Sequence, residues 1–348
     1  MTRVLLLSQL LASTAFATTL PREQTVEGVR FITHYVEGAD DSSPLIIAIH
    51  GRGGTPEKFE SVFEGFETRA EIALPQGFDA FDKGFQWFDW PRGTGDEEAG
   101  RRMGVAEDRL WRAIAGLAKG RKVIVTGFSQ GAMLAFTIAA RHPNEVLEAV
   151  PVAGRMTHSL FPEQKGAPVF AIHGTADKTV ELKFARQAIG AFQMSGGTAE
   201  LHEVPGADHT FAADVQLLTL AELKRVIESG PIVSSAAAEA VVRRFWEAYS
   251  RAAWGDIAAL VTPGYQHHLG AKSLSLVQYK DGPGTLHKVL EGCKVEIDSL
   301  VPSQTTVAVR WTAKGKQAKK EVTVTGMTFH EMHGEKISAT WEVTSPPR

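Results

Sequence analysis

Cysteine is nearly absent from this chain of 348 residues, since Cys293 is the only one. A single thiol excludes an intramolecular disulfide and any metal site built on cysteines. Long runs of one charge sign are also missing, and 37 basic and 40 acidic residues leave a net charge of −3. Because nucleic-acid binding depends on a basic surface, we expect no nucleic-acid partner.

A long hydrophobic segment is missing too. The apolar residues 4–11 follow Arg3 and precede the small-x-small sequence at 15–17. This is the pattern of a secretory signal peptide, and its apolar core is too short to span a bilayer. We therefore predict that residues 1–17 are a signal peptide cleaved after Ala17, that the protein is secreted or periplasmic, and that it has no stable membrane anchor.

Metal-binding patterns are equally scarce. The histidines at 267–268 and 330–333 do not have the H-E-x-x-H spacing of a helical zinc site. The acidic residues 96–98 stand where a helix is expected to begin, and they suit the positive end of its dipole. We predict no metal ion and no cofactor.

The clearest functional signal is a G-x-S-x-G motif at residues 127–131, directly after the apolar run 122–126. A serine in this motif stands on a tight turn between a buried strand and a helix, where its hydroxyl is exposed. The two glycines let the strand and helix backbones approach closely. Because a chain with 33 glycines can contain the motif by chance, its partners must decide its meaning.

Candidate partners follow Ser129 in the order acid, then histidine. A serine hydroxyl becomes a good nucleophile when an adjacent imidazole takes its proton and a carboxylate orients that imidazole. We predict that Ser129 is the nucleophile, Asp177 the acid and His209 the base. Asp208 is a competing acid, but a residue next to the base in sequence rarely points at its ring. Asp177 as a helix N-cap is the structural alternative.

A His-Gly-rich segment at residues 50–54 follows another apolar strand and is typical of an oxyanion-hole loop. Such a hole needs two backbone N–H groups, each contributing about 3–4 kcal/mol to catalysis. We predict the N–H groups of Arg52 and Gln130. The Arg52 side chain lies in solvent or attracts an acidic substrate group, and His50 is expected to orient the loop.

Three aromatic residues, Trp87, Phe88 and Trp90, stand in a segment bounded by glycine and proline. Two interpretations are open for them. They pack into the core, or they form a wall that binds the acyl group of a substrate. We predict them as substrate-binding residues.

Short apolar strands alternate with helical patterns between residues 25 and 229, which predicts a doubly wound, mostly parallel α/β sheet. The predicted strands are 28–36, 44–49, 70–74, 122–127, 147–152, 168–172 and 199–204. The predicted helices are 56–68, 97–118, 131–141, 180–194 and 213–229.

Several motifs in this region resemble the phospholipase/carboxylesterase family of α/β-hydrolases, which includes acyl-protein thioesterases. The matching segments are His50-Gly51-Arg52-Gly53, Pro75-Gln76-Gly77, Gly84-Phe85-Gln86-Trp87-Phe88-Asp89, Gly127-Phe128-Ser129-Gln130-Gly131, His173-Gly174-x-x-Asp177-x-x-Val180 and Gly206-x-x-His209. The resemblance implies a compact hydrolase that acts on small-molecule carboxylic esters or thioesters. Arg52 departs from the family, where this position is often small or apolar.

Residues 230–236 form a small, polar segment with a proline, which predicts a linker. The pattern changes in 237–348, to amphipathic helices at 237–252 and 255–260 and alternating strands at 295–300, 306–312, 320–330 and 336–342. Helices followed by a run of strands predict a separate α+β domain with a curved sheet.

This C-terminal region resembles the SnoaL-like branch of the NTF2-like family, through Phe245-Trp246-x-x-Tyr249, Gly255-Asp256 and Gly334-x-x-Ile337-x-x-x-Trp341. The resemblance implies a small cone-shaped domain whose sheet face commonly pairs, so a homodimer through this domain is expected. Some family members use a buried acid and histidine in catalysis, for which the candidates here are His267, His268, His330 and Glu342.

Three functional classes follow from these patterns. The first is a secreted serine hydrolase that cleaves esters through an acyl-enzyme on Ser129. The second is a hydrolase fold that binds its ligand without turnover, against which the intact Ser129, Asp177 and His209 argue. The third places the main activity in the C-terminal domain, as a cyclase, an isomerase or a binding module.

Overall fold

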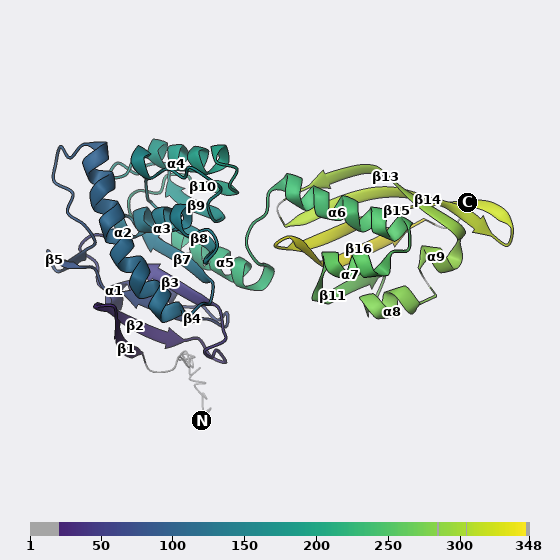
Figure 1. Cartoon of the computed structure of the whole chain (residues 1–348), viewed down its shortest axis with the longest axis horizontal. Helices are drawn as coiled ribbons and strands as arrows, with labels where there is room; N and C mark the ends of the chain where they lie inside the picture. The colour runs from purple at the N-terminus through teal and green to yellow at the C-terminus, as the bar shows by residue number, and fades with distance from the viewer. Residues whose placement is uncertain (1–20, 284, 304, 346–348) are drawn as a thin grey trace, which may run out of the picture.

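The computed structural model describes residues 21–283, 285–303 and 305–345. The predicted signal peptide, residues 1–17, lies outside the described residues. The chain forms two units side by side, each with its own sheet (Figure 1). In the described part of the chain, no helix has the length and apolar character needed to cross a membrane.

The first unit contains residues 21–229. Its strands are β1 (Arg22–Val26), β2 (Val29–Tyr35), β3 (Leu45–Ile49), β4 (Glu71–Pro75), β5 (Asp79–Phe81), β6 (Gly84–Gln86), β7 (Val123–Phe128), β8 (Val146–Val152), β9 (Val169–Gly174) and β10 (Ala199–Val204). Its helices are α1 (Pro56–Glu60), α2 (Asp96–Ala118), α3 (Gln130–Arg141), α4 (Leu182–Met194) and α5 (Ala213–Ser229), with 3₁₀ turns at Ser61–Phe63 and His158–Leu160.

Eight strands form one sheet in the order β1-β2-β4-β3-β7-β8-β9-β10. The pairs from β4 through β10 are parallel, whereas β1 and β2 pair antiparallel at one edge. The predicted doubly wound, mostly parallel α/β fold is therefore confirmed. In a parallel sheet the carboxyl ends of all strands point in the same direction, and the loops that follow these ends carry the candidate site.

Helices cover both faces of this sheet, because successive side chains along its central strands point alternately into two apolar cores. Ile47 on β3 packs into a core with α2, α3 and α4, whereas Ile46 packs into a second core with α5 and the turn after α1. Strands buried on both faces read as continuous apolar runs. This is why the sequence predicts them within one or two residues.

The second unit begins with α6 (Ser235–Ser250), and the five residues 230–234 precede it. Its other helices are α7 (Trp254–Leu260), α8 (Leu276–Asp281) and α9 (Leu286–Val289). Its strands are β11 (Val261–Leu269), β12 (Lys272–Ser275), β13 (Glu291–Pro302), β14 (Thr306–Gln317), β15 (Lys320–His333) and β16 (Lys336–Thr344). They form one sheet in the order β12-β11-β16-β15-β14-β13.

The helix α6 covers one face of this six-stranded sheet and completes a third apolar core. Phe245 and Trp246 on α6 pack there with Trp311 on β14. The long strands alternate strictly between buried and exposed residues, as a sheet with one covered face requires. The predicted α+β cone domain is confirmed in its fold.

A buried ion pair holds the connecting segment against the first unit. Glu148 on β8 lies 2.6 Å from the Arg225 guanidinium on α5, and its second oxygen accepts the Ile232 N–H at 2.7 Å. The Gly334 N–H donates to the Ser229 carbonyl from the second unit. The connecting segment is therefore held to the first unit at Ile232, and Ser229, the residue before the segment, contacts the second unit.

The structure differs from the sequence prediction in several short elements. The helix expected over 56–68 ends at Glu60 and continues as a 3₁₀ turn, and Gly65 at φ 85° prevents a helical continuation. The strands β1, β11 and β12, the hairpin β5–β6 and the helices α8 and α9 were not predicted. The exposed strand β1 has no apolar run that could have signalled it.

Candidate active site

Ser129 lies on a strained turn between β7 and α3. Its backbone adopts φ 56° and ψ −115°, which is unusual for a residue with a side chain. The turn requires glycine on both sides, because a Cβ atom at Gly127 would lie 2.5 Å from the backbone of Gly131. Such strain is typical of a nucleophile elbow, in which the serine hydroxyl is held out at the end of the strand.

His209 connects the serine to a buried carboxylate. Its Nε2 lies 3.0 Å from Ser129 Oγ, and its Nδ1 lies 2.7 Å from Asp177 Oδ2. An ionised carboxylate only accepts hydrogen bonds, so Nδ1 carries the proton and Nε2 is left with a lone pair facing the serine hydroxyl. The structure thus brings together the three predicted residues, which are far apart in the sequence.

Asp177 is held rigidly in the loop after β9. Its Oδ1 accepts the backbone N–H groups of Thr179 and Val180, both at 2.8 Å. The side chain is fully buried. Asp208 is exposed instead, and its carboxylate accepts a hydrogen bond from Thr210. The competing acid therefore does not contact the imidazole through any hydrogen bond in the described residues.

The loop after β3 brings the predicted oxyanion donors to the same edge. Gln130 is the first residue of α3, which follows β7. Arg52 lies in the loop after β3, the strand that neighbours β7 in the sheet. In the described part of the chain, neither backbone N–H donates a hydrogen bond to another residue. The hairpin β5–β6 supports the loop, because Gly53 donates to the Phe85 carbonyl at 2.7 Å.

Two buried histidines fix the loops around the site. The Nδ1 of His50 lies 2.7 Å from the Gly51 carbonyl, and its Nε2 accepts the Gly77 N–H at 3.0 Å. His173 lies 2.7 Å from the Val180 carbonyl through Nε2. Burial lowers the pKa of both imidazoles, so they stay neutral and hold the loops through hydrogen bonds to the backbone.

The aromatic residues predicted for substrate binding lie elsewhere. Trp87 and Phe88 are core residues with 1% and 4% exposure, and the Trp87 indole N–H donates to the His50 carbonyl. Trp90 packs partly buried against the same core. The Gln130 side chain helps to hold them there, because it accepts a hydrogen bond from the Trp87 N–H and donates one to the Phe88 carbonyl. The sequence did not signal this role of Gln130.

A pocket of about 350 Å³ opens directly beside the Ser129 hydroxyl. It is lined by His50, Gly51, Arg52, Gly53, Gly54, Thr55, Lys58, Phe59, Phe128, Ser129 and His209. Its apolar wall is made by Phe59 and Phe128, and the Phe128 ring packs on the His209 imidazole at 4.9 Å. Trp87, Phe88 and Trp90, the residues predicted to form an acyl-binding wall, are not among the residues that line this pocket.

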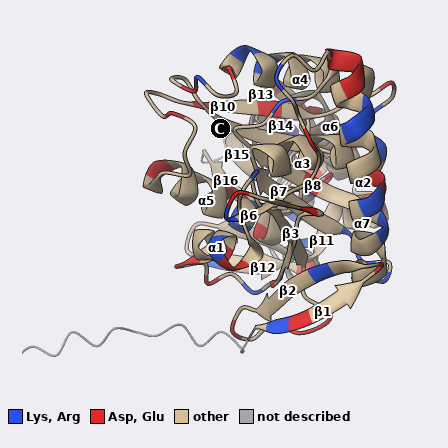
Figure 2. Cartoon of the chain, turned by 90° about the vertical axis from the view of Figure 1, so that its left-hand side faces the viewer, with Lys and Arg blue, Asp and Glu red and all other residues tan. Residues whose placement is uncertain are grey.

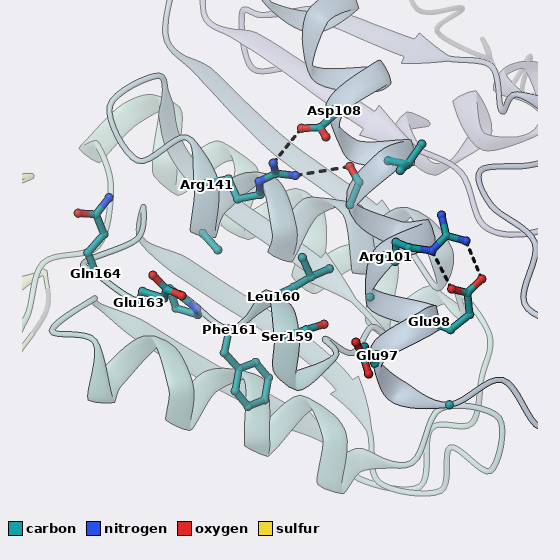
Figure 3. Close-up of a pocket in the computed structure, with 16 residues that line it drawn as sticks. Glu97, Glu98, Arg101, Asp108, Arg141, Ser159, Leu160, Phe161, Glu163 and Gln164 are labelled. Carbon is teal, nitrogen blue, oxygen red and sulfur yellow. Dashed lines mark hydrogen bonds and ion pairs between the residues drawn. The ribbon is translucent and has the colours of Figure 1, made fainter.

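A larger groove of about 1330 Å³ lies along α2 and does not include Ser129 (Figure 3). Several charged side chains line it, and some of them form ion pairs. Arg141 lies 2.8 Å from Asp108, and Arg101 lies 2.7 Å from Glu98. Among the described residues that line the groove, Ser159 carries the one hydroxyl side chain, and the partner of this hydroxyl is Thr157 rather than a histidine, so we take the smaller pocket as the candidate site.

Comparison with known families agrees with this geometry. A family model described as phospholipase/carboxylesterase matches residues 32–219, which is more than half of the chain and includes Ser129, Asp177 and His209. The chain belongs to the phospholipase/carboxylesterase family. Within this family region lie the strained turn at Ser129, the loop after β3 and both buried histidines.

A solved structure, that of esterase PE8, shows the same fold as the first unit. Esterase PE8 has a TM-score of 0.50 at 22% identity, covering 59% of this chain and 98% of that one. A Bacillus cereus carboxylesterase has a TM-score of 0.49 at 17% identity, covering 56% of this chain and 94% of that one. An uncharacterized secreted protein of Arthroderma benhamiae is 23% identical over 205 residues, or 48% of this chain. The chain spans only 21% of the length of that curated relative.

The phospholipase/carboxylesterase unit is followed by a second family region, because residues 242–340 match a model described as a SnoaL-like domain. Inside this domain, His267 Nε2 lies 2.9 Å from Glu342, and the Tyr279 hydroxyl donates to the same carboxylate at 3.2 Å. His330 is fully buried and accepts the Trp246 indole N–H. His268 stacks on Trp341 at the surface, apart from this network.

Proposed function

We propose that this chain is a serine hydrolase that cleaves carboxylic esters through an acyl-enzyme on Ser129. The observation that carries the proposal is the position of His209, which lies within hydrogen-bond distance of both Ser129 and Asp177. The strained turn at Ser129 and the pocket beside it support the same chemistry.

In the first half-reaction, Ser129 Oγ attacks the ester carbonyl carbon while its proton moves to His209 Nε2. Asp177 stabilises the imidazolium that forms. The developing oxyanion binds the N–H groups of Gln130 and Arg52. His209 then gives its proton to the leaving alcohol, and the acyl group stays on Ser129. In the second half, His209 takes a proton from water, the hydroxide attacks the acyl-enzyme, and Ser129 Oγ recovers its proton as the acid leaves.

Thioesters fit the same scheme, because a thiolate leaving group also departs from a tetrahedral intermediate and needs less help from an acid. The proposed substrate class is therefore a small-molecule ester, and thioesters are a second class to be tested beside it. The proposed location is outside the cell or in the periplasm. Support for it comes from the N-terminal sequence and from the secreted relative in Arthroderma benhamiae.

The proposed oligomer is a homodimer through the second unit. The uncovered face of its sheet exposes large apolar side chains on neighbouring strands, with Phe329 opposite Trp341 and Met327 opposite Val343. These four are between 42% and 70% exposed. Rows of large apolar residues on a sheet face are typical of interaction surfaces.

The buried pair of His267 and Glu342 favours a second candidate, in which the SnoaL-like domain carries its own acid–base activity. Against it stands the packing of this pair. Tyr279 stacks on the His267 ring at 3.6 Å and bonds Glu342, while Tyr265 bonds the other histidine nitrogen at 3.0 Å. Because both nitrogens of His267 and one carboxylate oxygen of Glu342 have protein partners, the network suits a structural role.

The test is hydrolysis of p-nitrophenyl esters from acetate to palmitate, with a thioester series beside them, by the wild type and by Ser129→Ala. We expect kcat to fall by about four decades or more in the variant. Hydrolysis that persists in Ser129→Ala would contradict the proposal, and a cyclase or isomerase activity that survives this substitution would favour the second candidate.

A further inference from the structure

The pocket beside Ser129 is lined by two cationic side chains, Arg52 and Lys58, and by no carboxylate. The two cations differ in how they are held. Arg52 Nε donates to Gln86 at 3.0 Å, and its guanidinium lies 3.9 Å from the centre of the Phe81 ring. Arg52 is therefore engaged with the hairpin β5–β6 rather than available to a ligand.

Lys58 is not engaged in this way. It stands on α1 between Glu57 and Glu60, and Figure 2 shows both charge signs on this short helix. Glu57 pairs with Arg30 at 2.8 Å, and Glu60 lies 3.3 Å from the buried His34. Across the described residues, no carboxylate lies within ion-pair distance of the Lys58 ammonium. Lys58 is an exposed residue that lines the pocket, and its charge has no protein counter-ion there.

Part of the pocket wall beside Lys58 is apolar. Phe59 follows Lys58, and its ring meets Phe211 edge-on at 5.9 Å, while Phe211 contacts Phe128 beside the nucleophile. A ligand bound at Ser129 can therefore contact phenyl rings and, in the same pocket, a cation. A volume of about 350 Å³ is enough for a chain of several methylene groups.

We propose that Lys58 is a specificity-determining residue that recognises an anionic group on the ester, separated from the scissile carbonyl by a short apolar segment. This inference rests on the proposed esterase function of Ser129. The substrate class is thus an ester that carries a carboxylate or a similar anion, on either its acyl or its alcohol portion.

Two matched pairs of esters test the proposal and locate the anion. Mono-p-nitrophenyl adipate and p-nitrophenyl hexanoate differ only by a terminal carboxylate in place of a methyl group on the acyl side. The hexanoyl esters of 4-hydroxybenzoate and of 4-methylphenol differ in the same way on the alcohol side. For each pair, the ratio of kcat/KM for the anionic ester to that for the neutral ester is measured in wild type, Lys58→Gln and Lys58→Glu.

We expect Lys58→Gln to lower the ratio up to about fivefold in at least one pair, the range of an exposed charge interaction. Lys58→Glu should lower it further, and the wild-type preference should weaken as salt is raised. Lys122→Gln is the matched control. It removes an exposed lysine at the start of β7, the end of the strand opposite to Ser129, and should leave both ratios unchanged.

The outcomes separate this inference from the function on which it rests. If both members of a pair are hydrolysed in a Ser129-dependent manner and neither ratio responds to Lys58, the proposed role of Lys58 is wrong while the esterase function stands. If none of the four esters is hydrolysed in a Ser129-dependent manner, the proposed function fails and the inference falls with it.

Discussion

Gly131 lies so close to Ile49 that a Cβ atom on the glycine would be 2.0 Å from the Ile49 carbonyl oxygen. The contact joins the start of α3 to the end of β3, and so joins the two segments that carry the proposed oxyanion donors. No real Cβ atom tolerates this distance, so a side chain at 131 must push the nucleophile turn away from the loop after β3.

Gly131→Ala should therefore damage both stability and activity. We expect destabilisation of about 1–3 kcal/mol, the usual cost of overpacking, and a loss of roughly a hundredfold in kcat/KM. The measurements are thermal unfolding and p-nitrophenyl ester hydrolysis. Gly190→Ala on α4 is the control, because nothing lies within 4 Å of its Cβ position and alanine favours a helix. Equal effects of the two substitutions would refute the role of the close contact.

Asp177→Asn should lower kcat by about four decades. An amide in place of the carboxylate favours the wrong imidazole tautomer, since its NH₂ group can donate to His209 Nδ1. Asp208→Asn alters the neighbouring carboxylate, which contacts only Thr210 in the described structure, and should change kcat less than about threefold. If Asp208→Asn caused the larger loss, the assignment of the acid would have to be reversed.

The central strands and the order of the catalytic residues could be predicted from the sequence for physical reasons. A strand buried on both faces must be mainly apolar, as residues 123–128 are with Thr126 as their one polar side chain, and a nucleophile elbow needs glycine on both sides. The order Ser129, Asp177, His209 along the chain then limits the candidates for the acid and the base. Their mutual distances come only from the three-dimensional structure.

Other features had no local signal. An aromatic residue in a glycine-bounded loop, such as Trp87, is compatible with a place in a substrate pocket or in the hydrophobic core. The contacts that place Trp87 in the core come from His50 and Gln130, which are distant in the sequence. The strand β11 contains Pro263, Gly264 and two histidines, which obscure its alternation. The tyrosines around Glu342 come from three separate elements, so no spacing along the chain reveals that network.

Acid should destabilise the SnoaL-like domain through His330. Complete burial, with a smaller effect of the nearby His267, lowers the pKa of this imidazole from its ordinary value of 6.5 to about 3. A proton on Nε2 would also break the hydrogen bond that this atom accepts from the Trp246 N–H. The unfolded chain binds the proton below pH 6.5 and the folded chain does not, so stability is full above pH 6.5 and is lost as pH falls toward 3.

The slope of this loss is about 1.4 kcal/mol per pH unit for one proton. Calorimetry between pH 4 and 6 should therefore show that His330→Gln reduces the pH dependence of the unfolding free energy by about one proton. An unchanged slope in this variant would show that other groups cause the acid sensitivity.

The exposed sheet face should control oligomeric state. Phe329→Glu with Trp341→Glu places two charges in the middle of the apolar row, and we expect the mass measured by light scattering to fall from that of a dimer to that of a monomer. Val105→Glu on α2 changes a residue of 60% exposure outside this face and should leave the mass unchanged. A monomeric wild type would contradict the proposed dimer.

The nucleophilic character of Ser129 is the central claim, and covalent labelling tests it most directly. The protein is treated with a fluorophosphonate, whose phosphorus is attacked by activated serine hydroxyls with release of fluoride, and intact mass and peptide mapping locate the adduct. The account predicts one adduct per chain, on the peptide that contains Ser129, absent in Ser129→Ala and formed far more slowly in His209→Ala. An unlabelled wild type, or an adduct on another residue, would contradict it.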